Sequence, residues 1–174
     1  GPFDTVYRDR LVKQWLERVT EMKLPFTPGF NFVFFLAKPT DVREWNMQGL
    51  PADDFSTENG VIVTRGTRWP LMVDPQGQAN KWIKNMCAEA GVEVGKPSDK
   101  EFLRAIENAV RFGKPFVMEN VLESLDPALE PVMLKKTFKQ GGNIVMKIGD
   151  NTIPYHPDFK FYLTTKLPNP HYAP

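Results

Sequence analysis

The sequence predicts an α/β fold in which helices flank a parallel sheet, and two observations support this class. Helical and strand patterns alternate through the middle of the chain, which is typical of a parallel sheet with helices on both faces. The segments 70–73 and 116–118 are apolar without interruption, as strands covered on both faces are. With 174 residues, 41% of them hydrophobic, the chain is long enough for one domain with its own core.

An amphipathic helix is expected at the start of the chain. Asp4 is a suitable N-cap, and apolar residues recur at helical spacing from Tyr7 to Met22. Pro25 and Pro28 are expected to stop this helix because proline cannot continue it.

A helical turn anchored by Trp45 and then a loop are expected before the core. The turn covers residues 40–45, and proline and polar residues mark the loop. These loop residues are Pro51, Asp53, Asp54 and Ser56. We therefore expect one domain, residues 1–174, with an N-terminal helix and segment at 1–58 and an αβ core at 59–174.

The core is expected to begin with β structure followed by a helix. Residues 61–63 are β-branched and predict a strand, and residues 70–73 predict a second one. From Gly77 an apolar stripe at helical spacing continues to Gly91, with Cys87 on its buried face. Because Cys87 is the only cysteine, it cannot form an internal disulfide, and we expect a core residue in a reducing compartment.

Further helices and a short strand are expected in the middle of the chain. Residues 92–94 predict the strand. Ser98 and Glu101 form a capping box that would open a helix closed by Gly113. The Asp-Pro pair at 126–127 predicts another helix start.

The last part of the chain predicts a β-hairpin and a final strand. Residues 144–148 and 152–155 flank a Gly-Asp-Asn turn, and apolar residues alternate from Phe159 to Leu163. Three lysines are expected on one solvated helix face: Lys135, Lys136 and Lys139.

Charge and hydropathy exclude several classes of protein. Twenty-two basic and twenty-one acidic residues do not give the electrostatic footprint of a nucleic-acid binder. No apolar run approaches the ~20 residues of a membrane helix, and the first residues do not form a signal sequence. His156 and His171 lack an accompanying ligand cluster, so no metal site is expected. We expect a soluble intracellular protein with no nucleic-acid or membrane partner.

Residues 69–82 have the layout of a phosphate-binding loop. An apolar strand leads through a polar loop containing Gly77 into an amphipathic helix, and Lys81 lies on its first turn, as in the G-x-x-x-x-G-K-[ST] motif. However, Pro75 and Asn80 stand where the motif has glycines, and Trp82 stands where it has the residue that holds Mg²⁺. Only Lys81 matches a defining position.

The chain resembles the fifth AAA+ module of axonemal dynein heavy chains over nearly its whole length. The degenerate loop, an apolar strand ending in Glu119-Asn120, and a later strand ending in Thr164-Thr165 follow the order of an AAA+ ATPase large subdomain. The strings that resemble the dynein module are residues 55–65, 74–84, 125–131, 137–142 and 164–172.

The resemblance implies an AAA+ large subdomain with a β-hairpin insertion. The sheet order of that family is 5-1-4-3-2, and the strands present would be the first four. The fifth strand and the helical lid subdomain are expected beyond Pro174. A chain without the fifth strand would expose the first strand as an edge, which is an aggregation liability.

The resemblance also implies a vestigial ATP site. Pro75 removes a backbone donor, and Asn80 brings a side chain to a place of close approach. Glu119 and Asn120 stand at the positions of the magnesium-binding Asp and the water-polarising Glu. An amide cannot accept the proton of the attacking water, so we expect no catalytic residue, no metal and no nucleotide cofactor. The polar sensor position would fall on Thr165, Lys166 or Asn169.

Structural roles are favoured for the vestigial residues. Lys81 is expected to be a solvated or ion-paired helix lysine rather than a phosphate ligand. Trp82 is either a core anchor or a plug of the vacant cleft, and core packing is favoured. Glu119 and Asn120 are expected to hold neighbouring loops by hydrogen bonds.

The resemblance implies a non-catalytic structural and relay module within a ring of six unequal AAA+ modules. The parent chain would be an ATP-hydrolysing microtubule motor of the cytoskeleton, located in the cytoplasm and the axoneme of the cilium. Its partners would be the neighbouring AAA+ modules and the mobile linker of the same heavy chain, with only indirect microtubule contact. The alternatives are a regulatory site that binds ATP or ADP without hydrolysis and a weakly active ATPase that depends on Glu119.

Overall fold

The computed structural model describes residues 3–171 and contains two compact units, with the break between Phe35 and Leu36. In the first unit, α1 (Thr5–Glu21) begins after Asp4, whose side chain accepts a hydrogen bond from the backbone N–H of Tyr7 at 2.7 Å. The predicted N-cap is therefore confirmed, and the helix ends ahead of Pro25 and Pro28. A short helix, α2 (Phe32–Leu36), crosses the break between the two units.

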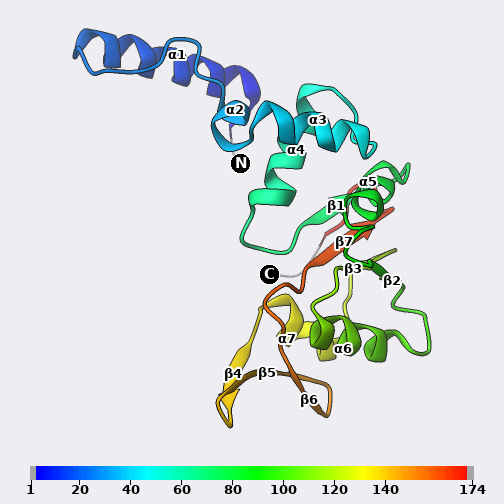
Figure 1. Ribbon diagram of the computed structural model, residues 1–174. Helices are drawn as coiled ribbons and strands as arrows, with labels where there is room; N and C mark the ends of the chain where they lie inside the picture. Colours follow the sequence, from blue (N-terminus) through cyan, green and yellow to red (C-terminus); the bar gives the residue numbers. More distant parts are fainter. Residues whose placement is uncertain (1–2, 172–174) are drawn as a thin grey trace. The chain divides into compact units, whose positions relative to one another are not determined.

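The second unit carries the αβ core, in which strands alternate with helices (Figure 1). Its helices are α3 (Pro39–Met47), α4 (Asp54–Arg65), α5 (Gln78–Met86), α6 (Phe102–Phe112), the 3₁₀ turn η1 (Pro127–Leu129) and α7 (Glu130–Met133). Its strands are β1 (Leu71–Val73), β2 (Glu93–Gly95), β3 (Phe116–Met118), β4 (Thr137–Gln140), β5 (Asn143–Ile148), β6 (Asn151–Pro154) and β7 (Phe161–Thr165).

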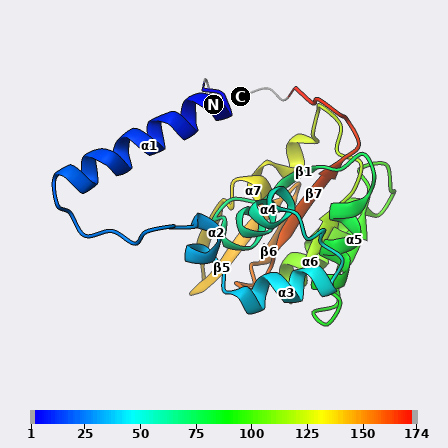
Figure 2. The ribbon, with the colours of Figure 1, turned by 90° about the horizontal axis from the view of Figure 1, so that it is seen from above.

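A four-stranded parallel sheet forms the centre of this unit, in the order β1-β7-β3-β2. This order equals the 1-4-3-2 portion of the AAA+ pattern, so the predicted fold class is confirmed. Strands β3 and β7 are central and fully buried, whereas Leu71 and Val73 of β1 are 40% and 50% exposed. Within residues 3–171, β1 pairs only with β7, so its other edge is open, as expected. Helix α5 packs against β7 and β3 (Figure 2).

A second, antiparallel sheet of three strands packs against α6 and α7. The predicted hairpin is confirmed as β5 and β6, but β4 was not expected. Gly141 and Gly142, both with positive φ, form the turn that joins β4 to β5. The prediction of one helix face for three lysines is wrong, because α7 ends at Met133 and Lys139 lies on β4.

Apolar side chains of both sheets and of α6 share one core. The residues of this cluster are Phe102, Ile106, Ala109, Val110, Phe116, Met118, Val121, Leu129, Val132, Met146, Ile148, Ile153, Phe159, Phe161 and Leu163. Because β7 lies between β1 and β3 and is covered on both faces, all its side chains are buried. The predicted final strand is therefore confirmed as β7, but it begins at Phe161 rather than Phe159, and both of its faces are buried instead of alternate residues.

The strand predicted at residues 61–63 is also wrong, because these residues belong to α4. Asp53 caps this helix and accepts a hydrogen bond from the backbone N–H of Ser56 at 2.9 Å. Gly60 and Val61 are buried while Ile62 is 64% exposed, so one face of this helix enters the core. Residue 58, where the expected N-terminal segment ends, lies inside this helix.

Three other predicted helix boundaries have different outcomes. Helix α5 ends at Met86 rather than Gly91, with Cys87 as its buried C-cap. The capping box of Ser98 is wrong: Asp99 instead accepts a hydrogen bond from the backbone N–H of Lys96, and α6 begins at Phe102. Gly113 closes α6 with a φ of 69°, as predicted.

No helix within residues 3–171 is long and apolar enough to cross a membrane.

Gly60 allows α4 to pack closely against Trp45 of α3. A Cβ added at Gly60 would lie 2.8 Å from a ring carbon of Trp45 and 3.0 Å from Leu50. Gly→Ala within a helix normally stabilises it by about 1 kcal/mol. Here we expect Gly60→Ala to lower the free energy of unfolding by about 1 to 3 kcal/mol, because both neighbours are buried and cannot move freely.

Urea denaturation checks whether Gly60→Ala destabilises the protein instead of stabilising it. Glu58→Ala, on an exposed position of the same helix, is the matched control and should be nearly neutral. A stabilised Gly60→Ala protein would show that α3 and α4 do not pack as closely as described.

Candidate functional site

The candidate site lies where the carboxyl ends of three parallel strands meet. Asp74 follows β1, Glu119 follows β3, and Thr165 ends β7. Because these strands run parallel and adjacent, their carboxyl ends lie at one edge of the sheet, where α/β proteins commonly bind ligands. The structure therefore brings together the predicted phosphate loop, Glu119 and the backbone of Thr165, one of the three sensor candidates.

Asp74 occupies the N-terminus of α5 with its own carboxylate. Oδ2 of Asp74 accepts a hydrogen bond from the backbone N–H of Asn80, in the first turn of α5, at 2.9 Å. The backbone N–H of Asp74 donates to the carbonyl of Thr165 at 2.8 Å, and the residue is only 7% exposed. A helix N-terminus attracts anions, so a bound phosphate would normally take this position. Here an anion of the chain itself is fixed there.

The loop before α5 retains the backbone shape of a turn into a helix. Gly77 is the N-cap of α5 and has a φ of 78°, a left-handed conformation that favours glycine. Pro75 is exposed and has no backbone N–H to offer a ligand.

Glu119 joins the end of β3 to α5 through one carboxylate oxygen. Its Oε1 accepts a hydrogen bond from Nδ2 of Asn80 at 2.7 Å and lies 2.6 Å from Nζ of Lys84, one helical turn further along. Burial by itself would raise the pKa of Glu119, but the hydrogen bonds from Lys84 and Asn80 and the charge of Lys84 outweigh it, so the pKa lies below its usual value. We call this set of contacts the Glu119 bridge.

Lys81 and Trp82 point to different environments although they are adjacent. Lys81 is exposed and has no ion pair within residues 3–171. Trp82 is 1% exposed, and its ring meets that of Trp45 edge-on at 6.3 Å between centroids. Trp82 is thus a core residue that holds α5 against α3. Its Nε1 has no hydrogen-bond partner in the described structure.

The cavity nearest the loop is poorly suited to phosphate. It has a volume of about 430 Å³ and lies along β1, between Leu50, Gln78 and Trp82. Its only charged lining residue is Asp74, and no lysine or arginine lines it. A polyphosphate in this cavity would meet a carboxylate and no positive charge.

The side chains of the three sensor candidates do not reach the loop. Thr165 is buried, and its Oγ1 donates to the carbonyl of Val121 at 2.6 Å and accepts from the backbone N–H of Leu167 at 3.2 Å. Lys166 and Asn169 are exposed, and Asn169 pairs with His171 at 3.3 Å. None of these side chains contacts Glu119 or the loop within the described structure.

Asn120 has a left-handed backbone, with a φ of 57°. Asparagine tolerates this conformation better than most residues, and the chain turns here before Val121 donates to the carbonyl of Thr164. Its role in the structure is that of a turn residue after β3. Within residues 3–171, no group of three or more His, Cys, Asp or Glu residues could hold a metal ion.

Sequence reasoning missed the two residues that complete the site, Asp74 and Lys84. Asp74 could have been noticed because an acidic residue directly after a buried strand reaches the edge of the sheet. Lys84 could have been found as the residue four positions after Asn80, which shares its helix face.

Comparison with known proteins shows extensive similarity to dynein heavy chains. Residues 43–174 match the family described as ATP-binding dynein motor region. The chain is 56% identical to mouse dynein axonemal heavy chain 1 over 174 residues, and 47% identical to human dynein axonemal heavy chain 6. It is 53% identical over 176 residues to the dynein-1-beta heavy chain, flagellar inner arm I1 complex, of Chlamydomonas reinhardtii. All of this chain is covered in each case, but only 4% of each relative's length.

Trp82 and Lys81 should differ sharply in their contributions to stability. We expect Trp82→Ala to lower the free energy of unfolding by about 3 to 5 kcal/mol, because it leaves a cavity in the core. Lys81→Ala should change it by less than about 0.5 kcal/mol, because the side chain is exposed. Equal and small effects in urea denaturation would contradict the burial of the indole.

The Glu119 bridge should make stability depend on acid pH. Because the pKa of Glu119 is lowered in the folded protein, its contribution is complete above the usual glutamate pKa of about 4.3 and is lost as pH falls through the lower folded value. The difference in unfolding free energy between the wild type and Glu119→Gln should therefore be constant near neutrality and shrink below about pH 4. Lys84→Gln should reduce this pH-dependent difference, and a difference that grows in acid would contradict the bridge.

Proposed function

Because the chain belongs to the ATP-binding dynein motor region family, we propose that it is a non-catalytic structural and relay module of an axonemal dynein motor. Since it spans about 4% of its curated relatives, it would act as one segment of a much longer heavy chain in the axoneme of the cilium. The similarity of residues 55–65, 74–84, 125–131, 137–142 and 164–172 to the fifth AAA+ module favours that position in the ring. Its partners would be neighbouring modules and the linker of the same chain, with microtubule contact only indirect.

The carboxylate of Asp74 at the N-terminus of α5 is the observation that carries this proposal. A nucleotide could place a phosphate there only by displacing a buried carboxylate from its hydrogen bond with Asn80. The displaced carboxylate would then lie beside the phosphates, and like charges at such distances repel strongly in a partly buried site. Lys81 faces solvent and does not offset this cost.

The Glu119 bridge supports a relay role for the same module. In a phosphate-loop site that binds nucleotide, the ligand and its Mg²⁺ connect the loop after the first strand to the acidic residue at the end of another strand, which here is β3. Here Asn80 and Lys84 of α5 are bonded directly to Glu119 after β3. The helix and the sheet are thereby held together without a ligand, so the module would transmit movements of its neighbours as one body.

A regulatory nucleotide site is the second candidate, and one observation favours it. Gly77 keeps the left-handed turn into α5, and Lys81 lies on the first helical turn with no ion pair among residues 3–171. Such a site would need Asp74 to move away when nucleotide binds. A weakly active ATPase would in addition need a general base, and Glu119 is already engaged by two donors.

Isothermal titration with ATP and with ADP, each with and without Mg²⁺, separates these candidates. We expect no binding tighter than about 1 mM. Micromolar binding that is lost in Lys81→Ala but retained in Lys139→Ala, an exposed lysine on β4, would overturn the non-catalytic proposal and favour a nucleotide site at the loop. Hydrolysis above background would favour the ATPase alternative.

A further inference from the structure

Helices α3 and α4 are joined to each other by close packing and by an ion pair. Gly60 of α4 lies against the ring of Trp45 in α3, with no room for a Cβ between them. At the end of α4, a guanidinium nitrogen of Arg65 lies 2.9 Å from Oδ2 of Asp41 in α3. The two helices therefore form one unit, which we call the α3–α4 pair.

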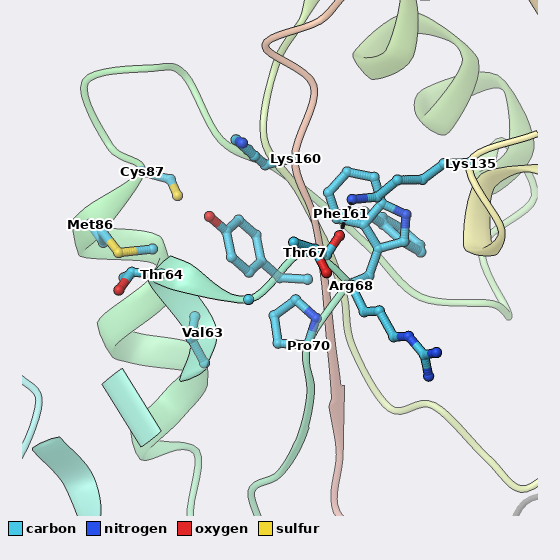
Figure 3. Close-up of a pocket in the computed structure, with 13 residues that line it drawn as sticks. Val63, Thr64, Thr67, Arg68, Pro70, Met86, Cys87, Lys135, Lys160 and Phe161 are labelled. Atoms are coloured by element: carbon cyan, nitrogen blue, oxygen red, sulfur yellow. Dashed lines mark hydrogen bonds between the residues drawn. The ribbon is translucent and has the colours of Figure 1, made fainter. Parts of the chain in front are cut away.

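Three cavities lie along the boundary between this pair and the rest of the αβ core. The cavity of about 430 Å³ described above lies between α4 and β1. A second, of about 280 Å³, lies between Arg65 at the end of α4 and Met86 at the end of α5. A third, of about 560 Å³, is lined in part by Thr64 of α4 and by Cys87, the C-cap of α5 (Figure 3). Protein interiors are normally close-packed, so this boundary leaves the pair unusual room to move.

The pair contacts α5 through one aromatic contact and one hydrogen bond near the end of α3. The rings of Trp45 and Trp82 meet edge-on, and Nδ2 of Asn85 donates to the carbonyl of Gln48, the C-cap of α3, at 2.6 Å. Packed helices can slide or tilt by small amounts about such contacts, as they do in shear motions of domains. The buried indole of Trp82 is therefore placed as a pivot for the α3–α4 pair.

Buried polar atoms without a hydrogen-bond partner are concentrated at the same contact. Among residues 3–171, all such side-chain atoms belong to α3, its C-cap or α5: Oδ1 of Asn46, Oε1 of Gln48, Oδ1 of Asn80 and Nε1 of Trp82. Almost all buried polar groups in proteins are paired, and an unpaired one costs free energy that contact with water would recover. The closed contact between α3 and α5 therefore carries a free-energy cost that opening would remove.

We propose that the α3–α4 pair tilts about Trp82 between this closed state and an open state in which water reaches the unpaired groups. Apolar contact between the two indoles favours the closed state, and hydration of the unpaired groups favours the open one. The cavities give the pair room to tilt, and the loop 66–70, which joins α4 to β1, would absorb the movement. Because these terms oppose each other, the two states lie close in free energy.

The tilting pair would be the moving part of the relay module. A displacement of the preceding residues, 3–35, would reach the sheet through this pair, because the chain passes through α3 and α4 before it enters β1. This role rests on the function proposed above, whereas the tilting itself does not.

Hydrogen exchange of the indole N–H of Trp82, followed by NMR, tests this proposal. In the wild type this N–H should exchange more than about tenfold faster than the backbone amides of β3, which are released only when the whole core unfolds. Gln48→Met replaces an unpaired acceptor by an apolar group of similar shape, so it should slow the exchange about tenfold, or about 1.4 kcal/mol in the free energy of opening. Ala79→Leu should also slow it, because the larger side chain fills the cavity beside β1. Gln140→Met, on the exposed strand β4, is the matched control and should leave the rate unchanged.

Two outcomes would overturn the proposal. One is exchange of the Trp82 indole N–H as slow as that of the β3 amides, which would show that the contact opens only on global unfolding. The other is an unchanged rate in both Gln48→Met and Ala79→Leu, which would show that neither the unpaired groups nor the cavity controls the opening. Because no nucleotide is present in this experiment, neither outcome decides between the non-catalytic proposal and a nucleotide site, which the titration with ATP and ADP tests separately.

Discussion

The buried carboxylate of Asp74 is the constraint on which the candidate site depends. It joins three elements, because it follows β1, its backbone pairs with Thr165 of β7, and its side chain binds the first turn of α5. The same position in a phosphate-binding loop is left free for a ligand. The chain therefore keeps the strand, loop and helix of such a site while an internal anion satisfies the helix terminus.

Packing on the other side of α5 reinforces this arrangement. Trp82 is buried against Trp45, and Gly60 lets α4 come close to the same indole. Trp82, which stands at the magnesium-binding position of the motif, is thus a core residue that packs α5 against α3. The Glu119 bridge fixes the helix from the strand side, through Asn80 and Lys84. Side-chain contacts hold α5 on both sides without any ligand.

The sequence predicted the parallel sheet and its order because apolar strands and the resemblance agreed at Leu71–Val73 and Phe116–Met118. It failed at residues 61–63, where a β-branched run lies in a helix that Asp53 caps and Trp45 covers, so tertiary packing overrode local propensity. The sequence identified the loop and Glu119 but not the hydrogen bonds that Asp74 and Glu119 make with α5. The partners of Asp74 and Glu119 depend on how strands and helix meet, which spacing alone does not give.

The central claim is that the carboxylate of Asp74 occupies the N-terminus of α5 in place of a phosphate. The most direct test compares pyrophosphate binding by the wild type and by Asp74→Ala, measured from the amide NMR signal of Asn80. The wild type should show no shift at submillimolar pyrophosphate, because the carboxylate already holds that N–H. Asp74→Ala should show a saturable shift once the terminus is free. An equal response of the two proteins, whether both bind or neither does, would contradict the central role of Asp74.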